Sequence, residues 1–489
     1  MTHLPRLDRV LRSIIALFVA AVVVSSCAVT NSSLPSPTVV AVPTPTSVPL
    51  TTVPIAASPT APSQPTAAVP TTVGGDWPTY HRDNARTGFD PSVQASTTLL
   101  PGWRSTALDG EIYAEPLVVG GFVYVATEND TVYRLDRATG KVAWQAHLGE
   151  PIARSQLPCG DIAITGITST PVIDPTRGII YVVTFVQPGH HELVALQLAT
   201  GEVRFRQPID PSGADPLTHQ QRSALSLAGD TVYVAFGGLW GDCGNYHGWV
   251  VAANAADGKV GAQYQVPTQR EGAIWAPSGP AIDAAGNVYV STGNGSSVDP
   301  AVFDFGDAVL RLSPDLKLLD WFAPTNWAVL NRADADIGSV GPALLEGGTL
   351  FQIGKEGVGY LLNVAALGHV SAPAFQAKVC GASFGGTAYA ARSVFVPCTD
   401  SLVALSVANG NSFSIRWTVP MAFAGPPIVA GGVVWSIARD GTLYGIDPAD
   451  GHVLSQGPVG TPMHFATPSA SGRQMFVAAG KVVLAFSME

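Results

Sequence analysis

Short apolar runs alternate with polar turns along most of the chain. The segment Gly121–Trp144, GFVYVATENDTVYRLDRATGKVAW, contains two runs of β-forming residues, Val123–Ala126 and Val132–Leu135, and the start of a third. The polar residues Glu128–Asp130 separate the first two runs, and Thr139-Gly140 follows the second, as turns between strands do. Because the runs carry apolar side chains on both faces, we expect strands that neighbouring sheets cover on both sides.

An aromatic residue near the middle of the first run marks each repeat of this pattern. The eight markers are Tyr124, Tyr181, Tyr233, Tyr289, Phe351, Phe395, Trp435 and Phe476. They follow one another at intervals of about 40 to 60 residues, and a four-stranded propeller blade needs roughly 40. The repeats therefore predict an all-β fold, an eight-bladed β-propeller whose early blades carry insertions and whose late blades are bare.

The two ends of the repeat region complement each other. Leu99–Trp103 (LLPGW) matches the last strand of a repeat but stands alone, while the last repeat, Ala466–Phe486, has three strands and lacks a fourth. We therefore expect Leu99–Arg104 to pair with Val482–Phe486. A ring closed in this way by an N-terminal strand has no exposed sheet edge.

The composition fits many short buried strands joined by tight turns. The 489 residues include 51 Gly and 39 Pro, and only 13 % of them are charged. The formal net charge of −10 gives no reason to expect nucleic acid as a partner. The chain contains no CxxCH sequence for covalent haem, and no nucleophile elbow, Walker loop or dinucleotide-binding fingerprint in a suitable context.

The first 27 residues are a targeting segment rather than part of the fold. Arg6, Arg9 and Arg12 precede the apolar run Ile14–Val24, which is too short for an ordinary membrane-spanning helix. The run ends in VSSC, which resembles a bacterial lipobox, and the resemblance implies cleavage before Cys27 and acylation of its thiol. An ordinary signal peptide and an N-terminal anchor helix are the alternatives.

A segment rich in proline and threonine follows. Residues 28–75 contain ten Pro, ten Thr and no charged residue. Such a segment cannot bury a core, so we expect a disordered, partly polyproline tether in front of a propeller that spans residues 76–489. Together with the acylated Cys27, it predicts an extracytoplasmic, membrane-anchored lipoprotein of a bacterium.

Four cysteines remain besides Cys27, and an exported protein would form disulfides from them. Three pairings are possible. Cys380 and Cys398 belong to one repeat and are close in sequence, so we expect them to pair. Cys159 and Cys243 would then join the long insertions of the second and third repeats. Zinc binding is the alternative, but the chain lacks the CxxC spacing common in zinc sites.

The segment Asp76–Gly88, DWPTYHRDNARTG, and the repeats that follow it resemble the propellers of the PQQ-repeat family over roughly residues 76–489. That family includes quinoprotein alcohol dehydrogenases, which use pyrroloquinoline quinone (PQQ), and the lipoprotein propeller of the outer-membrane β-barrel assembly machinery. The resemblance implies the fold, whereas function has to be argued from a site.

Three residues of the fourth and fifth repeats resemble cofactor residues of the quinoprotein alcohol dehydrogenases. Trp275, in front of the sequence STGNG, matches the tryptophan on which the quinone stacks. Asn294, within that sequence, matches a calcium ligand. Lys355, in GKEGVGY, lies in a turn similar to the one whose basic residue contacts the quinone.

Three acidic residues complete the resemblance. In Asp334-Ala335-Asp336 it implies the catalytic base, with Asp336 as the first candidate and Asp334 as the second, and Asp336 is also a candidate calcium ligand. Asp242, shortly before His247-Gly248, is an approximate match to a further acidic ligand. These residue types suit the chemistry, because calcium prefers carboxylate and amide oxygens and an unpaired aspartate can accept the proton of an alcohol.

Each of these residues also has a structural interpretation. Asn294 between glycines suits a tight turn, the two aspartates of the pair could cap turns, Trp275 could belong to the core between blades, and Lys355 could be a solvated charge. The adjacent Cys-Cys pair that the family places over the quinone is absent.

Two functions therefore remain open. The first is an exported, lipid-anchored propeller that binds PQQ and calcium and oxidises a small alcohol. The alternative is a non-enzymatic interaction scaffold of the cell envelope, whose propeller face binds a protein partner. A scaffold would not need Trp, Asn, Asp and Lys at one end of its channel.

Overall fold

The computed structural model describes residues 75–92, 97–409 and 411–489, all of which belong to one compact unit, Thr66–Glu489. The predicted signal peptide with Cys27, and the tether except for Gly75, lie outside the described residues. Among the described residues, no helix is long and apolar enough to cross a membrane.

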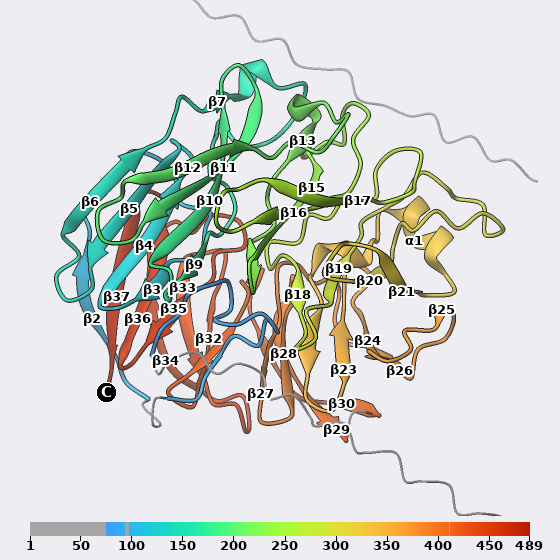
Figure 1. The fold of residues 1–489 in the computed structure, drawn as a ribbon. Helices are drawn as coiled ribbons and strands as arrows, with labels where there is room; N and C mark the ends of the chain where they lie inside the picture. Colours follow the sequence, from blue (N-terminus) through green and yellow to red (C-terminus); the bar gives the residue numbers. More distant parts are fainter. Residues whose placement is uncertain (1–74, 93–96, 410) are drawn as a thin grey trace, which may run out of the picture. The chain divides into compact units, whose positions relative to one another are not determined.

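Eight antiparallel sheets of at least four strands each form the blades of a β-propeller (Figure 1). Blades one to four consist of β3 (Leu117–Val119), β4 (Phe122–Thr127), β5 (Thr131–Asp136) and β6 (Val142–His147); β9 (Val172–Asp174), β10 (Ile179–Val186), β11 (His190–Gln197) and β12 (Val203–Pro208); β14 (Ser226–Ala228), β15 (Thr231–Gly238), β16 (Trp249–Asn254) and β17 (Val260–Gln265); and β18 (Ala281–Ile282), β19 (Val288–Ser291), β20 (Val309–Leu312) and β21 (Leu318–Ala323).

The remaining blades follow the same plan. Blades five to eight consist of β22 (Ala343–Leu345), β23 (Thr349–Gln352), β24 (Val358–Asn363) and β26 (Phe375–Lys378); β27 (Ala388–Ala390), β28 (Ser393–Pro397), β29 (Ser401–Ala408) and β30 (Ser412–Pro420); β31 (Ile428–Ala430), β32 (Val433–Ile437), β33 (Thr442–Ile446) and β34 (Val453–Pro458); and β35 (Ser469–Ser471), β36 (Gln474–Ala479), β37 (Val482–Met488) and β2 (Leu99–Arg104). Eight blades confirm the predicted all-β class.

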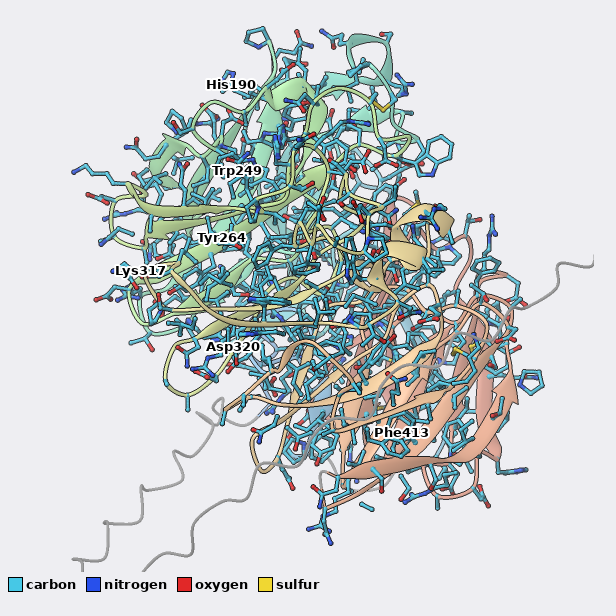
Figure 2. All side chains as sticks on the ribbon, turned by 90° about the vertical axis from the view of Figure 1, so that its right-hand side faces the viewer. His190, Trp249, Tyr264, Lys317, Asp320 and Phe413 are labelled. Carbon is cyan, nitrogen blue, oxygen red and sulfur yellow. A yellow bond between two sulfur atoms is a disulfide. The ribbon has the colours of Figure 1, made fainter. Side chains whose placement is uncertain are left out.

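The eight aromatic markers all lie on the second strand of their blade and are buried, at 3 % exposure or less. The first three strands of a blade are apolar on both faces because neighbouring blades cover them. The fourth strand is at the rim and alternates between exposed and half-buried residues, as in β6. Figure 2 shows Lys317, in the turn between β20 and β21, at this rim.

Glycine in the turn before the fourth strand allows neighbouring blades to approach closely. Gly140 has φ +69°, and a Cβ atom there would lie 2.3 Å from the Trp103 ring of the preceding blade. Gly201 stands in the same relation to Trp144, whose indole N–H donates to the Leu198 carbonyl at 3.0 Å. The repeated Thr-Gly and Asp-Gly turns are thus required by both backbone conformation and packing.

The two ends of the described chain share one blade. β2 pairs antiparallel with β37, with Leu99 opposite Met488 and Pro101 opposite Phe486. This is the pairing predicted from the absence of a fourth strand in the last repeat.

We name the two ends of the central channel by the connections that surround them. At the turn end, short turns join the first and second strands of each blade. The loop end carries the loops that precede each first strand and those that follow each second strand. Both lie at the same end because the start of the first strand is next to the end of the second strand in an antiparallel pair. The insertions lie at the loop end and include β7 (Ile152–Ala153), β8 (Ile164–Thr165), β13 (His219–Gln220) and α1 (Trp327–Ala333) (Figure 1).

Residues 75–90, which we call the strap, run around the channel wall and contact the first strand of every blade (blue in Figure 1). Its hydrogen-bond partners, in ring order, are Ser471, Val118, Ile173, Leu227, Ile282, Leu344, Tyr389 and Val429. The strap ends in β1 (Phe89–Asp90), which pairs parallel with β31. Both ends of the strap lie at the turn end, where Asp76 accepts a hydrogen bond from Gly120 N and Asp90 pairs with Ala430.

Side chains of the strap fill the channel. Tyr80 and His81 are buried, and their rings stack with centroids 4.3 Å apart. Burial and the nearby Arg86 lower the pKa of His81 to about 3, so this imidazole is neutral. Arg86 is 1 % exposed and donates hydrogen bonds to Thr79 Oγ1, to Ser226 Oγ and to backbone carbonyls. A buried guanidinium is stable here because most of its donors have partners.

Candidate functional site

The loops that carry the predicted cofactor residues all lie at the loop end. Trp275 precedes β18 and Asn294 follows β19, so both belong to blade four. Asp334 and Asp336 lie between α1 and β22, and Lys355 follows β23 in blade five. Adjacent blades thus place the two pairs of loops next to each other.

Lys355 connects these residues. Its Nζ atom lies 2.5 Å from Asp334 Oδ1 and 2.6 Å from Asp336 Oδ2, and 5.6 Å from the centre of the Trp275 ring. Asn294 Nδ2 donates to Asp334 Oδ1 at 2.8 Å. The structure therefore brings together five of the six residues that the sequence singled out, and it places a cation at the aromatic platform.

The two aspartates differ in environment. The Asp334 side chain is 73 % exposed, and the residue caps the C-terminus of α1 in a left-handed conformation. The Asp336 side chain is only 2 % exposed. Burial raises the pKa of Asp336, and the ion pair with Lys355 opposes that rise. Although burial disfavours its charge, Lys355 has a raised pKa because of Asp336 and Asp334. Lys355 thus favours the ionised form of Asp336 and opposes the effect of burial.

Asp307 is a further acidic residue at this site. It lies in the FDFGD sequence just before β20 and is fully buried. Its Oδ1 atom accepts a hydrogen bond from Ile337 N at 3.1 Å, and its backbone N–H donates to Gly293 O at 3.0 Å. Burial and the charge of Asp336 raise its pKa well above the usual value. Asp307 therefore joins the loops of Asn294 and Asp336, a role that neither periodicity nor spacing indicated.

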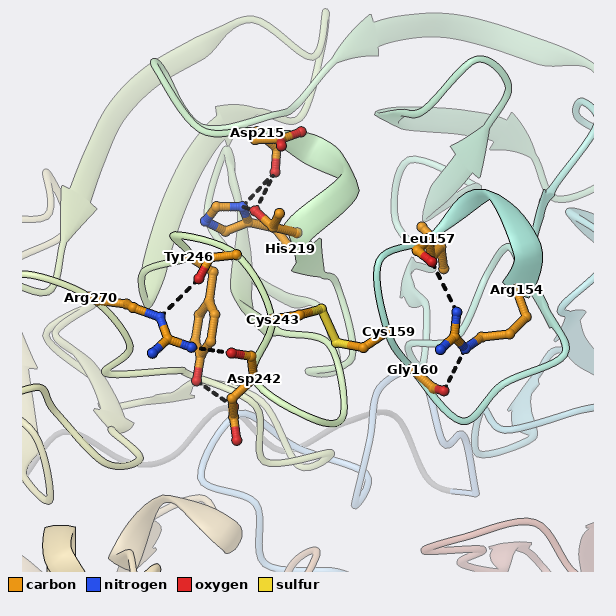
Figure 3. Close-up of a disulfide and its surroundings, with 12 residues drawn as sticks. Arg154, Leu157, Cys159, Gly160, Asp215, His219, Asp242, Cys243, Tyr246 and Arg270 are labelled. Carbon is orange, nitrogen blue, oxygen red and sulfur yellow. Dashed lines mark hydrogen bonds between the residues drawn. A yellow bond between two sulfur atoms is a disulfide. The ribbon is translucent and has the colours of Figure 1, made fainter.

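Within the described residues, no hydrogen bond or ion pair joins Asp242 to this group, and its interpretation as a calcium ligand stays a prediction. It is exposed, and its Oδ1 atom accepts from the Tyr246 hydroxyl at 2.6 Å, while its backbone carbonyl accepts from Arg270 (Figure 3). The disulfide of the adjacent Cys243 holds this loop against the insertion of blade two. Glu271 is the nearby acid whose pKa is raised, first by burial and also by Asp242 and Asp334.

The other five predicted residues offer some of the groups that a quinone and a cation would need. Asn294 Oδ1 and Asp336 Oδ1 are buried oxygens without a hydrogen-bond partner in the described part of the chain. Such oxygens are ligands that calcium prefers. The described residues contain no group of three His, Cys, Asp or Glu side chains that could hold a metal ion. A cation here would therefore depend on Asn294, Asp336 and oxygens of the bound ligand itself.

Two phenylalanines border the aromatic platform. The rings of Phe384 and Phe465 each lie 6.4 Å from Trp275, tilted by 53° and 54°. They stack on one another at 6.1 Å and 22°. Arg222, from the HQQR sequence of blade three, reaches across the channel mouth and lies 5.2 Å from the Phe465 ring and 5.1 Å from Tyr113. The loop end is thus lined by aromatic rings with guanidinium groups over them.

Both expected disulfides are present. Cys159 pairs with Cys243 across the insertions of blades two and three, with Cα atoms 6.0 Å apart, and Cys380 pairs with Cys398 within blade six, at 6.2 Å. Both bonds lie at the loop end, where they hold the connections of blades two and three and the loop that contains Phe384.

The protein is an all-β propeller. Its repeated blades form a ring, and a polar site lies at one end of the central channel. The chain belongs to the PQQ-repeat family, whose model, described as outer membrane protein assembly factor BamB, matches residues 101–304 and 336–488. No curated protein matches the chain.

Solved structures share the fold at low identity. The chain is similar to quinohemoprotein alcohol dehydrogenase ADHIIG of Pseudomonas putida HK5, with a TM-score of 0.70, 17 % identity, and coverage of 85 % of this chain and 80 % of that one. For the quinohemoprotein alcohol dehydrogenase of Comamonas testosteroni the values are 0.66, 19 %, 87 % and 81 %. For BamB of Moraxella catarrhalis they are 0.55, 15 %, 80 % and 100 %. At these identities the similarity establishes the fold.

Proposed function

We propose that the propeller binds a planar quinone of the PQQ class on Trp275 and, with calcium, oxidises a small alcohol. The single observation that carries this proposal is the position of Lys355. Its ammonium group lies between Asp334 and Asp336 and 5.6 Å from the Trp275 ring, while Asn294 Nδ2 donates a hydrogen bond to Asp334 Oδ1. A structural ion pair would not need an aromatic platform and two buried oxygens without partners beside it.

Each residue has a defined task in this proposal. Trp275 provides a flat face for the ring, and Asn294 and Asp336 offer the oxygens for calcium. Lys355 favours the ionised form of Asp336 against the effect of burial, and both calcium binding and acceptance of the hydroxyl proton by this carboxylate require that form. When bound, the quinone supplies the redox chemistry, with calcium to polarise it. Asp307 fixes the loops of Asn294 and Asp336 relative to each other.

Titration of the purified full chain with PQQ, in the presence and absence of calcium, tests the proposal by absorbance and calorimetry. We expect calcium-dependent binding that is lost in Asp336→Ala and weakened about tenfold or more in Trp275→Ala. Asp315→Ala and Trp240→Ala are matched controls, because both side chains are exposed and neither belongs to the proposed binding residues. Absence of calcium-dependent PQQ binding by the wild-type chain would overturn the enzyme proposal.

A non-enzymatic scaffold of the cell envelope is the second candidate function. Exposed apolar side chains on the loop-end connections favour it, with Trp240 70 % exposed, Val302 57 % and Val329 56 %. A contiguous apolar area is typical of a protein-binding face. In this case Trp240→Ser should reduce cross-linking to a partner in cells, whereas Asp336→Ala should leave it unchanged. The opposite result would exclude the scaffold.

We also propose that acyl chains on Cys27 hold the protein at the outer side of a bacterial membrane. Two acyl chains give stable attachment where a single chain gives a reversible one. Replacement of Cys27 by Ala should release the protein from membranes during fractionation. Equal membrane retention of the variant and the wild type would contradict acylation as the anchor.

A further inference from the structure

A second concave site lies among the loops of blades six to eight, the blades without insertions. We call it the aromatic pocket. It has a volume of about 160 Å³, and the residues that define it here are Phe384, Phe423, Ile437, Arg439, Met463 and Phe465. Its walls are mostly apolar, and its backbone groups are paired, as between Gly425 N and Ile437 O at 2.8 Å.

Two of the aromatic walls have an unusual backbone conformation. Phe423 has φ +48° and Phe465 has φ +63°, in the left-handed region that bulky residues rarely adopt. Phe423 is also 47 % exposed, so core packing does not explain why a phenylalanine stands there. Strained residues of this kind are concentrated at ligand clamps. The conformation turns an aromatic ring towards the mouth of the pocket at a cost in stability.

A cation lies at the same mouth. The Arg439 guanidinium is 4.9 Å from the centre of the Phe423 ring. Within the described residues its side chain has neither an ion pair nor a hydrogen bond. Arg222, on the Phe465 side, differs because it donates to the His464 carbonyl at 3.0 Å and lies near the acidic Glu128 and Asp161. Arg439 is therefore the guanidinium that is free to receive an anion.

We propose that the aromatic pocket binds a small molecule that consists of one aromatic ring and one carboxylate group. The volume suits a single ring, since a dry apolar cavity of about 150 Å³ is known to hold benzene. The apolar walls disfavour sugars and other polar molecules of that size. A guanidinium is the side chain best suited to pair with a carboxylate, which would lie at the mouth while the ring enters between Phe423 and Phe465.

The pocket is separate from the proposed quinone site. The stacked pair of Phe384 and Phe465 lies between them, and each of these rings contacts Trp275 from the pocket side at 6.4 Å. Neither Asp336 nor Lys355 lines the pocket. The inference therefore does not depend on the quinone, and failure of one proposal leaves the other open to its own test.

Calorimetry and saturation-transfer NMR of the full chain with benzoate test this proposal, with benzyl alcohol and acetate as comparison probes. We expect benzoate to bind, and both other probes to bind about tenfold more weakly or worse, because each lacks one of the two recognised groups. Arg439→Gln should weaken benzoate about tenfold and leave benzyl alcohol unchanged. The matched control is Arg416→Gln, an exposed arginine on β30 of blade six, which should have no effect.

Phe423→Gly separates binding from folding, because glycine tolerates the left-handed conformation and the variant should remain folded. It should lose benzoate binding, whereas Asp336→Ala should retain it. The proposal is wrong if benzoate does not bind to the wild type, if Arg439→Gln and Arg416→Gln have equal effects, or if benzyl alcohol and benzoate bind equally. Loss of benzoate binding in Asp336→Ala would likewise overturn the assignment, by placing benzoate at the quinone site.

Discussion

The two ends of the central channel are built from the same eight blades but differ in almost every physical respect. At the turn end the strap bonds to the first strand of each blade, and Tyr80 and His81 fill the channel interior. At the loop end the connections vary from blade to blade and include a helix, two disulfides and an aromatic pocket. The repeated part of the sequence therefore provides a closed base, and the non-repeated part provides the chemistry.

Buried polar groups are arranged differently in the two regions. Glu115, in the loop before β3, accepts from two strap residues, the Trp77 indole and His81 N, both at 2.8 Å. Within the strap itself, the buried atoms without a partner in the described residues are Tyr80 Oη, His81 Nδ1, Arg82 Nε, Arg86 Nε and Asp90 Oδ2. At the loop end, Asn294 Oδ1, Asp336 Oδ1 and Asp307 Oδ2 are buried without one in the described residues. Unpaired buried oxygens cost free energy unless a ligand supplies the partner. Unpaired buried groups therefore occur in both regions, but the three oxygens at the loop end belong to one group of neighbouring loops, which suits a ligand.

The largest effect is expected when the closed end is broken at Trp77, which is fully buried. Trp77→Ala removes a large core side chain and leaves Glu115 Oε1 without its donor. We expect a loss of about 5 kcal/mol in the free energy of unfolding, since a buried Trp→Ala costs roughly 3–5 kcal/mol and an unpaired buried acceptor adds to it. Urea denaturation measures this loss.

Trp240→Ala at the loop end is the control for Trp77→Ala, because Trp240 is 70 % exposed. Its unfolding free energy should stay within about 0.5 kcal/mol of the wild type. Similar losses in the two variants would mean that the strap does not stabilise the ring more than an exposed loop does.

Loss of a disulfide should give the next largest decrease in the free energy of unfolding, because the disulfides constrain the loop end as the strap constrains the first strands. In the chain-entropy model, loss of the Cys380–Cys398 bond, with a separation of 18, costs about 3 kcal/mol. Loss of the Cys159–Cys243 bond, with a separation of 84, costs about 4.6 kcal/mol. Thermal and urea unfolding of the two double Cys→Ser variants test this order. The reverse order would show that folded-state contacts around the bonds matter more than loop closure.

The blades could be predicted from the sequence, whereas the strap could not. The period of aromatic markers specified the blades, and the unmatched strands at both ends specified the pairing of β2 with β37, because strand patterns are local. The course of the strap was not predictable in this way. Its sequence YHRDNAR is mostly polar, and it is buried because it bonds with residues far along the chain, such as Ser226 and Glu115.

The candidate site shows the same division. Trp275, Asn294, Asp336 and Lys355 were found because they match a family pattern, and their loops meet because neighbouring blades align them. Asp242 is not bonded to these residues in the described part of the chain, and the sequence around it could not show that it would bond with Tyr246 beside a disulfide. The aromatic pocket was missed because backbone conformation and the approach of Phe423 to Arg439 have no periodic signal.

A pH-dependent difference is expected at Glu128, which lies in the turn between β4 and β5 at the loop end. Its Oε2 atom accepts from Gly166 N at 2.8 Å and from Thr168 Oγ1 at 3.0 Å. Burial raises the pKa of Glu128 to about 7, from 4.5. Because the folded state binds the proton more tightly than the unfolded state, the contribution is full below pH 4.5 and decreases as the pH rises to about 7.

Glu128→Gln should remove this decrease while preserving a hydrogen-bond acceptor. Between pH 4.5 and 8 the wild type should lose up to about 3 kcal/mol in unfolding free energy relative to the variant, as roughly 1.4 kcal/mol per pKa unit implies. Urea midpoints at several pH values measure the difference. Parallel pH profiles for the two proteins would show that Glu128 is already ionised in the folded state near pH 5.

The smallest predicted effect is a gain in the free energy of unfolding. It arises because contacts do not compensate the strained backbone of Phe423 at the loop end. In the strap, His81 and Arg86 also have positive φ, but both are buried and bonded to their surroundings. Phe423 has φ +48° and is 47 % exposed, so replacing it loses little buried surface. A left-handed non-glycine residue costs roughly 1–2 kcal/mol. Replacing it with glycine removes this cost, but the greater entropy of glycine in the unfolded state offsets part of the gain.

Phe423→Gly should therefore raise the free energy of unfolding by about 0.5–1 kcal/mol while the aromatic pocket loses its ligand. Urea denaturation without ligand measures the first change, and Ile415→Gly on β30, which is 48 % exposed, serves as the control that should destabilise. If Phe423→Gly destabilises as much as the control, the left-handed conformation carries no strain, and the difference between the two ends of the channel is one of shape alone.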